Sequence, residues 1–222
     1  MEAPQSLTAF IFANGDSGDG PLVRRTLAAY PDALLIAADG GLAQAAYYGL
    51  LPHVLIGDMD SVSDADVATA ASRSMAVHRF PAEKNETDLE LAVLHAAGAG
   101  AARIRLFAAL GGRLDQTISN IYLLALPALR GIDARIVADK QEIWLAYPGE
   151  TVIQGQSGDT VSLIPLNGDV QGVRTENLYY PLKDETLRFG PARGVSNVMT
   201  TDIARVHHQS GILLVVHTLG RA

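Results

Sequence analysis

The chain has 222 residues, and its 17 lysines and arginines against 24 aspartates and glutamates give a net charge of −7. Such acidity argues against binding along a nucleic-acid backbone, and no apolar run reaches the roughly 18 residues of a membrane span. The absence of cysteine excludes disulfides, thiolate chemistry and cysteine-based zinc sites. The first residues lack the basic stretch of a signal peptide, so we expect a cytoplasmic globular protein.

The first part of the chain alternates short apolar runs with helical stretches. The predicted strands are Leu7–Ala13, Ala33–Ala38, Val54–Ile56, Met75–Phe80 and Arg103–Phe107. The predicted helices are Pro21–Tyr30, Leu42–Gly49, Asp64–Ser74, Asp88–Ala97 and Asp115–Leu129. Strands that are apolar throughout and alternate with helices predict an α/β domain, a doubly wound and mostly parallel sheet with helices on both faces.

The composition changes in the second part, where only three of the 33 alanines follow Ala146. Alanine favours helix, so its loss indicates a β-rich region. Short strands separated by turn residues predict an antiparallel β-sandwich. These strands are Ala134–Ala138, Gln141–Ala146, Thr151–Ile153, Thr160–Ile164, Val170–Arg174, Thr186–Phe189, Ile203–His207 and Ile212–His217. We predict two domains, an α/β domain over residues 1–132 and a β-sandwich over residues 133–222.

Acidic residues follow four of the predicted parallel strands, at the sheet edge where such folds bind ligands. They are Asp39, Asp58, Asp60, Asp88 and Asp115. Like charges gathered in one crevice repel one another unless a cation lies among them, and magnesium prefers carboxylate and phosphate oxygens. Glycines in the same loops allow backbone amides to approach a phosphate, which Lys84 and Arg113 would neutralise. The pattern indicates a magnesium–nucleotide site.

Several of these residues also have a purely structural interpretation. Thr87 and Glu90 have the spacing of a helix capping box, and Asp115 has the position of a helix N-cap. The glycine pairs fit ordinary turns, and the loop 14–20 after the first strand fits either a phosphate contact or a plain turn. Asp58 and Asp60 are harder to explain without a cation, because side chains two residues apart on a strand share a face.

The ordered set of loops resembles the thiamine pyrophosphokinase family. The blocks that carry the resemblance are Asp39-Gly40-Gly41, Gly57-Asp58-Met59-Asp60-Ser61, Lys84-Asn85-Glu86-Thr87-Asp88-Leu89-Glu90 and Gly111-Gly112-Arg113-Leu114-Asp115. In the second part, Thr175-Glu176-Asn177-Leu178-Tyr179-Tyr180-Pro181-Leu182 and Ser196-Asn197 continue it. The resemblance spans nearly the whole chain, and it implies an α/β catalytic domain, a thiamine-binding β-sandwich and a homodimer with shared active sites.

The reaction that the resemblance implies is transfer of diphosphate from ATP to the hydroxyl of thiamine, which gives thiamine diphosphate and AMP. It implies Mg²⁺ held by Asp39, Asp58, Asp60 and Asp88. We predict catalytic roles for Asp60, Asp88 and Arg113, with either aspartate orienting the thiamine hydroxyl. The predicted ATP-binding residues are Asn14, Gly15, Asp39, Gly40, Gly41, Lys84, Thr87, Arg113 and Asp115. The predicted thiamine-binding residues are Tyr180, Ser196 and Asn197, contributed by the partner subunit.

Three residues depart from the family pattern. Gln116 stands where a histidine is frequent, Asn85 replaces a frequent aspartate, and Asn177 occupies a usual glycine position, which it tolerates if its backbone is left-handed. Two alternatives stay open at this point. One is a pyrophosphokinase for another hydroxymethyl heterocycle, such as a pterin, and the other is a non-catalytic nucleotide-binding regulator.

Overall fold

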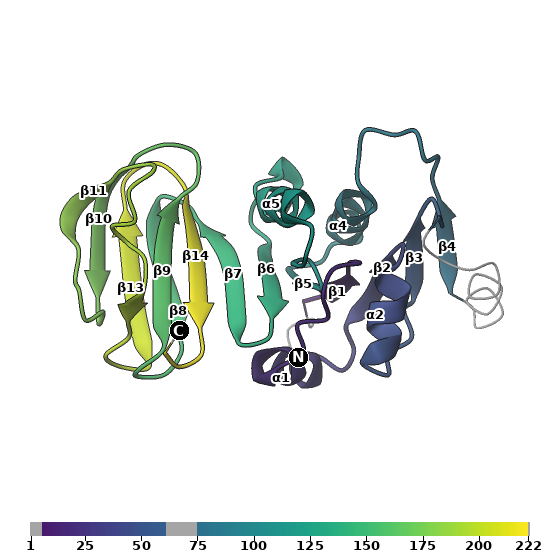
Figure 1. The fold of residues 1–222 in the computed structure, drawn as a ribbon, viewed down its shortest axis with the longest axis horizontal. Coiled ribbons are helices and arrows are strands. Elements are labelled where there is room, and N and C mark those ends of the chain that lie inside the picture. Colours follow the sequence, from purple (N-terminus) through teal and green to yellow (C-terminus); the bar gives the residue numbers. More distant parts are fainter. Residues whose placement is uncertain (1–5, 61–74, 222) are drawn as a thin grey trace, which may run out of the picture. The chain divides into compact units, whose positions relative to one another are not determined.

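The structure, a computed structural model, describes residues 6–60 and 75–221, and it divides into two compact units, Met1–Asp139 and Lys140–Ala222. The first unit combines helices with strands, and the second is built of strands (Figure 1). Strand β6 (Asp133–Ala138), which follows the predicted boundary at residue 132, pairs with the sheet of the first unit.

The sheet of the first unit is parallel in every neighbouring pair, with the order β6-β5-β1-β2-β3-β4. Its other strands are β1 (Thr8–Phe12), β2 (Leu34–Ala38), β3 (Val54–Gly57), β4 (Ala76–Arg79) and β5 (Arg103–Phe107). All five residues of β1 are buried, as expected for a strand covered on both faces. The predicted doubly wound α/β fold is confirmed.

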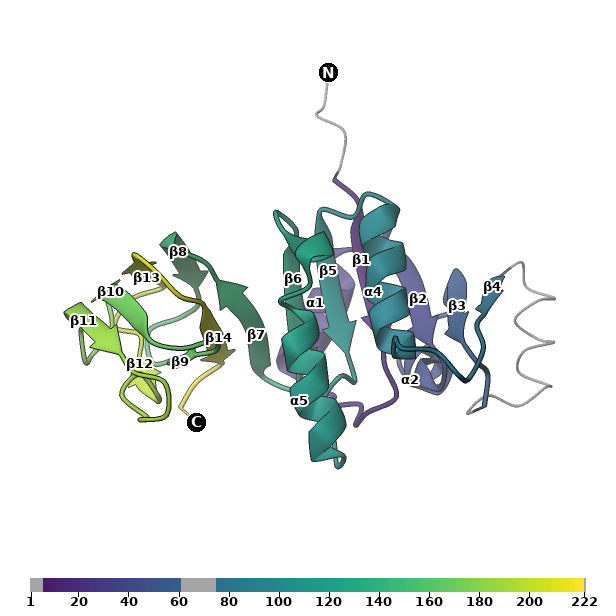
Figure 2. The same cartoon turned by 90° about the horizontal axis from the view of Figure 1, so that it is seen from above.

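The helices of this unit lie on both faces of the sheet, α1 (Pro21–Ala29) and α2 (Gly41–Tyr47) on one, α4 (Asp88–Gly98) and α5 (Leu114–Leu123) on the other (Figures 1 and 2). Helix α5 ends before the predicted Leu129, because Pro127 cannot continue it and begins a separate 3-10 turn, Pro127–Leu129. The predicted helix Asp64–Ser74 lies outside the described residues. Among the described helices, none is long and apolar enough to cross a membrane.

Aromatic rings fill the centre of the first unit. Phe10 and Phe12 on β1 and Phe107 on β5 are almost completely buried. The ring centroid of Phe107 lies 5.2 Å from that of Phe10, edge to face, and 5.3 Å from that of Phe12, stacked. Such contacts stabilise a core beyond the burial of apolar area alone. The rings hold β1 against β5, and each of these strands is followed by a loop that shapes the site described below.

The second unit is an antiparallel sandwich of two sheets, in the orders β12-β9-β14-β7 and β11-β10-β13-β8. Its strands are β7 (Gln141–Ala146), β8 (Gly149–Gln154), β9 (Thr160–Pro165), β10 (Val170–Glu176), β11 (Lys183–Leu187), β12 (Asn197–Val198), β13 (Ile203–His208) and β14 (Leu213–Thr218). One apolar core, which includes Trp144, Val173 and Val206, joins the two sheets. The predicted sandwich is confirmed.

A buried hydrogen bond between a carboxylate and a histidine ring lies in the second unit beside this core. The Asp159 carboxylate is 2.9 Å from Nε2 of His217, and it accepts hydrogen bonds from the backbone amides of Gln156 (2.9 Å) and Gly220 (2.7 Å). Burial on its own raises the pKa of Asp159, but the bonds from Gly220, His217 and Gln156 together outweigh burial and lower the pKa below its ordinary value. Asp159 therefore fastens the loop that precedes β9 to the end of β14.

We expect Asp159→Asn to lower the free energy of unfolding at pH 7 by about 1–3 kcal/mol, because the hydrogen bonds to a buried charge are weakened. Since the pKa of Asp159 is depressed in the folded protein, its charge contributes stability above the unfolded pKa, and this contribution is lost as the pH falls through the folded value. Urea unfolding followed by circular dichroism should show a difference between wild type and variant that narrows below about pH 4. If wild type and variant differ in unfolding free energy by the same amount at pH 7 and below about pH 4, the charge of Asp159 is not the source of the stability.

Candidate active site

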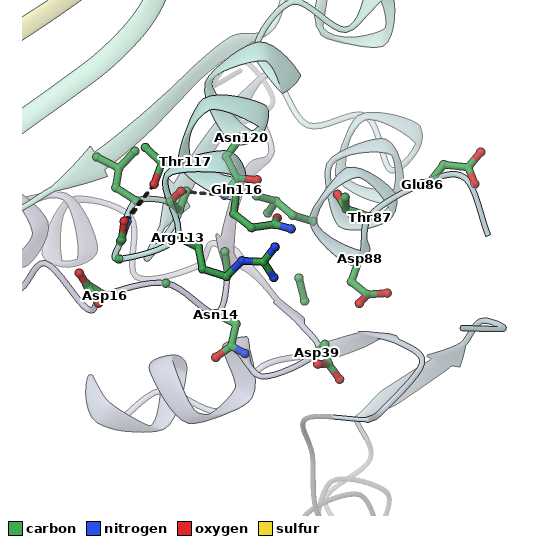
Figure 3. Close-up of a pocket in the computed structure, with 18 of the residues that line it drawn as sticks. Asn14, Asp16, Asp39, Glu86, Thr87, Asp88, Arg113, Gln116, Thr117 and Asn120 are labelled. Carbon is green, nitrogen blue, oxygen red and sulfur yellow. Dashed lines mark hydrogen bonds between the residues drawn. The ribbon is translucent and has the colours of Figure 1, made fainter. Parts of the chain in front are cut away.

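A cavity of about 680 Å³ opens at the carboxyl edge of the parallel sheet (Figure 3). Loops after β1, β2, β3, β4 and β5 contribute to its wall, together with the first turns of α4 and α5. Its volume is in the range of small-molecule and cofactor sites. Of the predicted site residues, those that line it are Asn14, Gly15, Asp39, Asp60, Lys84, Thr87, Asp88 and Arg113.

Three aspartates form a compact cluster at this edge. Asp39, Asp58 and Asp60 each offer a carboxylate oxygen, and these oxygens lie within 4.8 Å of one another. Asp39 is buried, and its Oδ1 has no hydrogen-bond partner among the described residues. Because a buried, unpaired carboxylate is costly next to two others, the arrangement is suited to a cation. The predicted fourth metal ligand, Asp88, is not part of this cluster.

Lys84 connects Asp88 to the cluster. Its Nζ lies 3.0 Å from Oδ1 of Asp88 and 3.6 Å from Oδ2 of Asp58. Burial raises the pKa of Asp88 above its ordinary value, although Lys84 opposes the shift. The pKa of Asp58 is lowered, first by the hydrogen bond from the Asp60 amide and also by Lys84. The lysine therefore balances part of the negative charge of Asp58 and Asp88.

Thr87 has a structural role in addition to its place in the cavity wall. It is the N-cap residue of α4, and its Oγ1 accepts a hydrogen bond from the amide of Glu90 at 3.1 Å. Asp115, in contrast, is not an N-cap, because α5 begins at Leu114 with Arg113 in the N-cap position. The Asp115 carboxylate instead pairs with the Arg113 guanidinium, and both side chains are exposed. Asp115 does not line the cavity, whereas Arg113 does.

Two predicted ATP-binding glycines have packing reasons of their own. A Cβ on Gly40 would lie 2.4 Å from the side chain of Asn14, and one on Gly41 would lie 1.8 Å from the carbonyl oxygen of Phe12. Neither residue lines the cavity. Both are required for close approach of the loop after β2 to the end of β1, and this approach holds Asn14 in the wall.

One face of α5 contributes cavity residues that the sequence analysis did not select. Gln116, Thr117 and Asn120 line the cavity together with Arg113, at the three- and four-residue spacing of a helix face. Thr117 Oγ1 accepts a hydrogen bond from the Gly111 amide at 3.1 Å, and Asn120 Nδ2 donates one to the Ala109 carbonyl at 2.7 Å. These bonds brace the loop after β5. The helical spacing that starts at Arg113 was the signal available in the sequence.

The predicted thiamine-binding residues lie together in the second unit. Asn197 is buried, its Oδ1 accepts a hydrogen bond from the Tyr180 amide at 2.9 Å, and its Nδ2 donates to the Tyr180 carbonyl at 2.7 Å. The Tyr180 ring is exposed. The Ser196 amide donates to Ser162 Oγ at 3.0 Å. Asn177 has φ +61°, the left-handed backbone expected for a residue at a glycine position.

Comparisons with known proteins agree with both units. Residues 28–137 match the family "Thiamin pyrophosphokinase, catalytic domain", and residues 150–213 match "Thiamin pyrophosphokinase, vitamin B1 binding domain". The chain is 28% identical over 186 residues to a thiamine pyrophosphokinase of Bacillus subtilis (strain 168), which covers 83% of this chain and 87% of the relative.

Solved structures agree as well. The crystal structure of the thiamine pyrophosphokinase from Bacillus subtilis has a TM-score of 0.84 at 27% identity, covering 96% of this chain and 99% of the other. That of the Geobacillus thermodenitrificans protein has a TM-score of 0.80 at 25% identity, covering 96% and 97%. Yeast thiamin pyrophosphokinase, at 16% identity and a TM-score of 0.79, with 98% and 88% covered, shares the fold.

The α/β unit with its acidic cavity and the β-sandwich thus define an ATP-dependent diphosphotransferase of two domains. The chain belongs to the thiamin pyrophosphokinase family.

We expect Asp39→Asn to raise the melting temperature when divalent cations are absent, because it removes one of three mutually repelling charges. Asparagine also suits the left-handed backbone of residue 39, whose φ is +46°. An increase of about 2–4 °C corresponds to roughly 1 kcal/mol for a chain of this size. Thermal unfolding with and without magnesium chloride measures it, and the variant should lose most of the stabilisation that magnesium gives the wild type. If Asp39→Asn melts at a lower temperature than the wild type in the absence of divalent cations, the expectation that repulsion among the three carboxylates destabilises the protein is wrong.

Proposed function

We propose that the protein transfers the diphosphate group of ATP to the hydroxyl of thiamine, with the cavity of the first unit holding the ATP. The observation that carries this proposal is the cluster of Asp39, Asp58 and Asp60, of which Asp39 and Asp60 line the cavity, in a family-matched catalytic domain. The match of residues 150–213 to a vitamin B1 binding domain favours thiamine over a pterin as the acceptor. The presence of every predicted metal aspartate speaks against a non-catalytic regulator.

The side chains at the cavity fit magnesium. Asp39, Asp58 and Asp60 offer hard oxygen ligands, and the unpartnered Oδ1 of Asp39 is the atom most in need of a cation. When bound, magnesium would neutralise charge on the phosphate oxygens during transfer. Asp88, the fourth predicted ligand, pairs with Lys84 in this structure.

The chain's own residues supply orientation and charge. The thiamine hydroxyl oxygen forms a bond to the β-phosphorus, the bond from that phosphorus to the oxygen bridging the α-phosphate breaks, and AMP leaves. Asp60 or Asp88 orients the hydroxyl and accepts its proton. Lys84 and Arg113 neutralise phosphate oxygens, and Arg113 would exchange its exposed bidentate pairing with Asp115 for a bidentate contact to phosphate.

Thiamine would bind at the second unit of a partner subunit, in a homodimer. The exposed ring of Tyr180 offers a face to the cationic, aromatic thiamine. Asn197 holds the Tyr180 backbone by two hydrogen bonds, so its contribution is to fix the position of the residue that carries this ring. In a two-fold dimer each of the two shared sites would be equivalent. We also propose a cytoplasmic location, where ATP is available as the co-substrate.

Product analysis tests the function. We expect the wild-type protein, incubated with ATP, magnesium and thiamine, to yield AMP and thiamine diphosphate in equal amounts. Asp58→Asn and Asp60→Asn should lose nearly all activity, because they remove proposed metal ligands, and without divalent cations they should melt no lower than the wild type, because they relieve repulsion. ADP with thiamine monophosphate indicates an ordinary kinase instead. Near-normal turnover of both variants contradicts the metal assignment.

The shared site makes a further prediction for mixed dimers of Asp58→Asn and Tyr180→Ala, each nearly inactive alone. In a dimer of one chain of each kind, both lesions fall in one shared site and the other site is intact. Random reassortment makes about half of the dimers mixed, so about a quarter of wild-type activity should return after the two variants are refolded together. The matched control is Asp58→Asn refolded with Asp60→Asn, where every site keeps a lesion. No recovery, with mixed dimers verified by native mass spectrometry, refutes the shared site.

A further inference from the structure

The loop 14–20 after β1 forms a separate part of the cavity wall. Asn14, Gly15 and Asp16 line the cavity. In Figure 3, Asp16 lies on the opposite side of the site from Asp39 and Asp88, with Arg113 between them. The cavity therefore has an end that holds the aspartate cluster and an end that holds Asp16. A nucleotide that spans the cavity meets these two ends with different chemical groups.

Hydrogen bonds to its backbone hold this loop in place. The amides of Gly15 and Asp16 donate to the carbonyls of Ala108 (2.7 Å) and Leu110 (2.9 Å). From the side of α2, Gln44 Nε2 donates to the Gly15 carbonyl at 3.0 Å, and the Tyr48 hydroxyl donates to the Ser17 carbonyl at 2.5 Å. None of these bonds uses the side chain of Asp16. The position of residue 16 is thus set independently of its carboxylate.

Asp16 is exposed, and its carboxylate makes no hydrogen bond and no ion pair with the other described residues. Asp19 in the same loop differs, because its carboxylate is bound by the Arg24 guanidinium at 2.6 and 2.7 Å and by the Tyr47 hydroxyl at 3.3 Å. Asp16 is also absent from the cluster of three carboxylates. Asp16 is therefore a hydrogen-bond acceptor at the cavity wall that has no donor among the described residues.

The charge of Asp16 determines which part of ATP can lie beside it. A carboxylate repels the triphosphate, which is attracted to the end where Lys84 and the proposed cation lie. A carboxylate accepts hydrogen bonds from hydroxyl donors, and acidic side chains bind ribose hydroxyls in this way in other nucleotide-binding folds. We propose that Asp16 accepts hydrogen bonds from the 2′- and 3′-hydroxyls of the ATP ribose and so selects ribonucleotides. This inference rests on the proposed function.

Equilibrium binding tests it without the reaction. Calorimetry with AMP, 2′-deoxy-AMP and 3′-deoxy-AMP, in the absence of divalent cations, gives the preference for each hydroxyl. We expect the wild type to bind AMP about tenfold or more tightly than either deoxynucleotide, as for hydrogen bonds to a charged acceptor. Asp16→Ala should bind AMP and each deoxynucleotide with affinities that differ by no more than about twofold. Asp16→Asn, which keeps one acceptor oxygen, should retain an intermediate ratio.

The matched control is Asp32→Ala, which removes the same charge from an exposed turn before β2, at the other edge of the sheet. It should leave the ratio at the wild-type value. Melting temperatures of both variants should match the wild type, because the loop is held by backbone bonds. An unchanged ratio in a folded Asp16→Ala protein overturns the proposal, and so does a wild type that binds all three nucleotides equally.

Steady-state kinetics separates this inference from the function on which it rests. With ATP, Asp16→Ala should raise KM about tenfold and leave kcat within about twofold, since the ribose contact is the same in the ground and transition states. With 2′-deoxy-ATP, which keeps only the 3′-hydroxyl, the difference in KM between wild type and variant should be smaller than with ATP. If the wild type forms no thiamine diphosphate, the proposed function fails. If it does and the variant keeps the wild-type preference for ATP over 2′-deoxy-ATP, the role of Asp16 alone fails.

Discussion

Electrostatic repulsion among carboxylates at one edge of a parallel sheet is the constraint on which the site depends. Asp39, Asp58 and Asp60 come from two different loops, and only the side-by-side alignment of β2 and β3 brings their oxygens within 4.8 Å. Proteins keep such groupings where a cation or a bound substrate compensates for them. Lys84 balances part of the charge, and the buried oxygen of Asp39 is left for a ligand from outside the chain.

The rest of the first unit keeps these loops in place. The rings of Phe10 and Phe12 on β1 contact that of Phe107 on β5, one edge to face and the other stacked, and join the two strands. Above them, Thr117 and Asn120 reach from α5 to the loop after β5. Hydrogen bonds of this kind make the wall of a site rigid before a ligand arrives, which lowers the ordering cost of binding. The packing of the core therefore fixes the positions of the loops that form the cavity wall.

Much of the fold and the acidic edge could be predicted from the sequence, because apolar runs alternate with helical stretches and the carboxyl ends of parallel strands meet at one edge. The two-residue strand Asn197–Val198 could not, since two residues carry no periodic pattern. The N-cap interpretation of Asp115 was wrong, because the start of a helix and the pairing of an exposed carboxylate are decided by neighbouring geometry. The hydrogen bonds between Asn197 and the Tyr180 backbone join residues 17 positions apart, and no local sequence pattern reveals such a pairing.

The single tryptophan has a practical consequence. Trp144 lies in β7, buried in the core of the second unit, and the chain has no other tryptophan. Its fluorescence emission therefore responds to the packing of the sandwich, whereas the cavity of the first unit is built from loops that carry no indole. Emission excited at the red edge of the absorption band, where tyrosine hardly absorbs, thus follows the second unit, Lys140–Ala222, through denaturation. To follow the first unit by tryptophan fluorescence, a tryptophan would have to be introduced there by substitution.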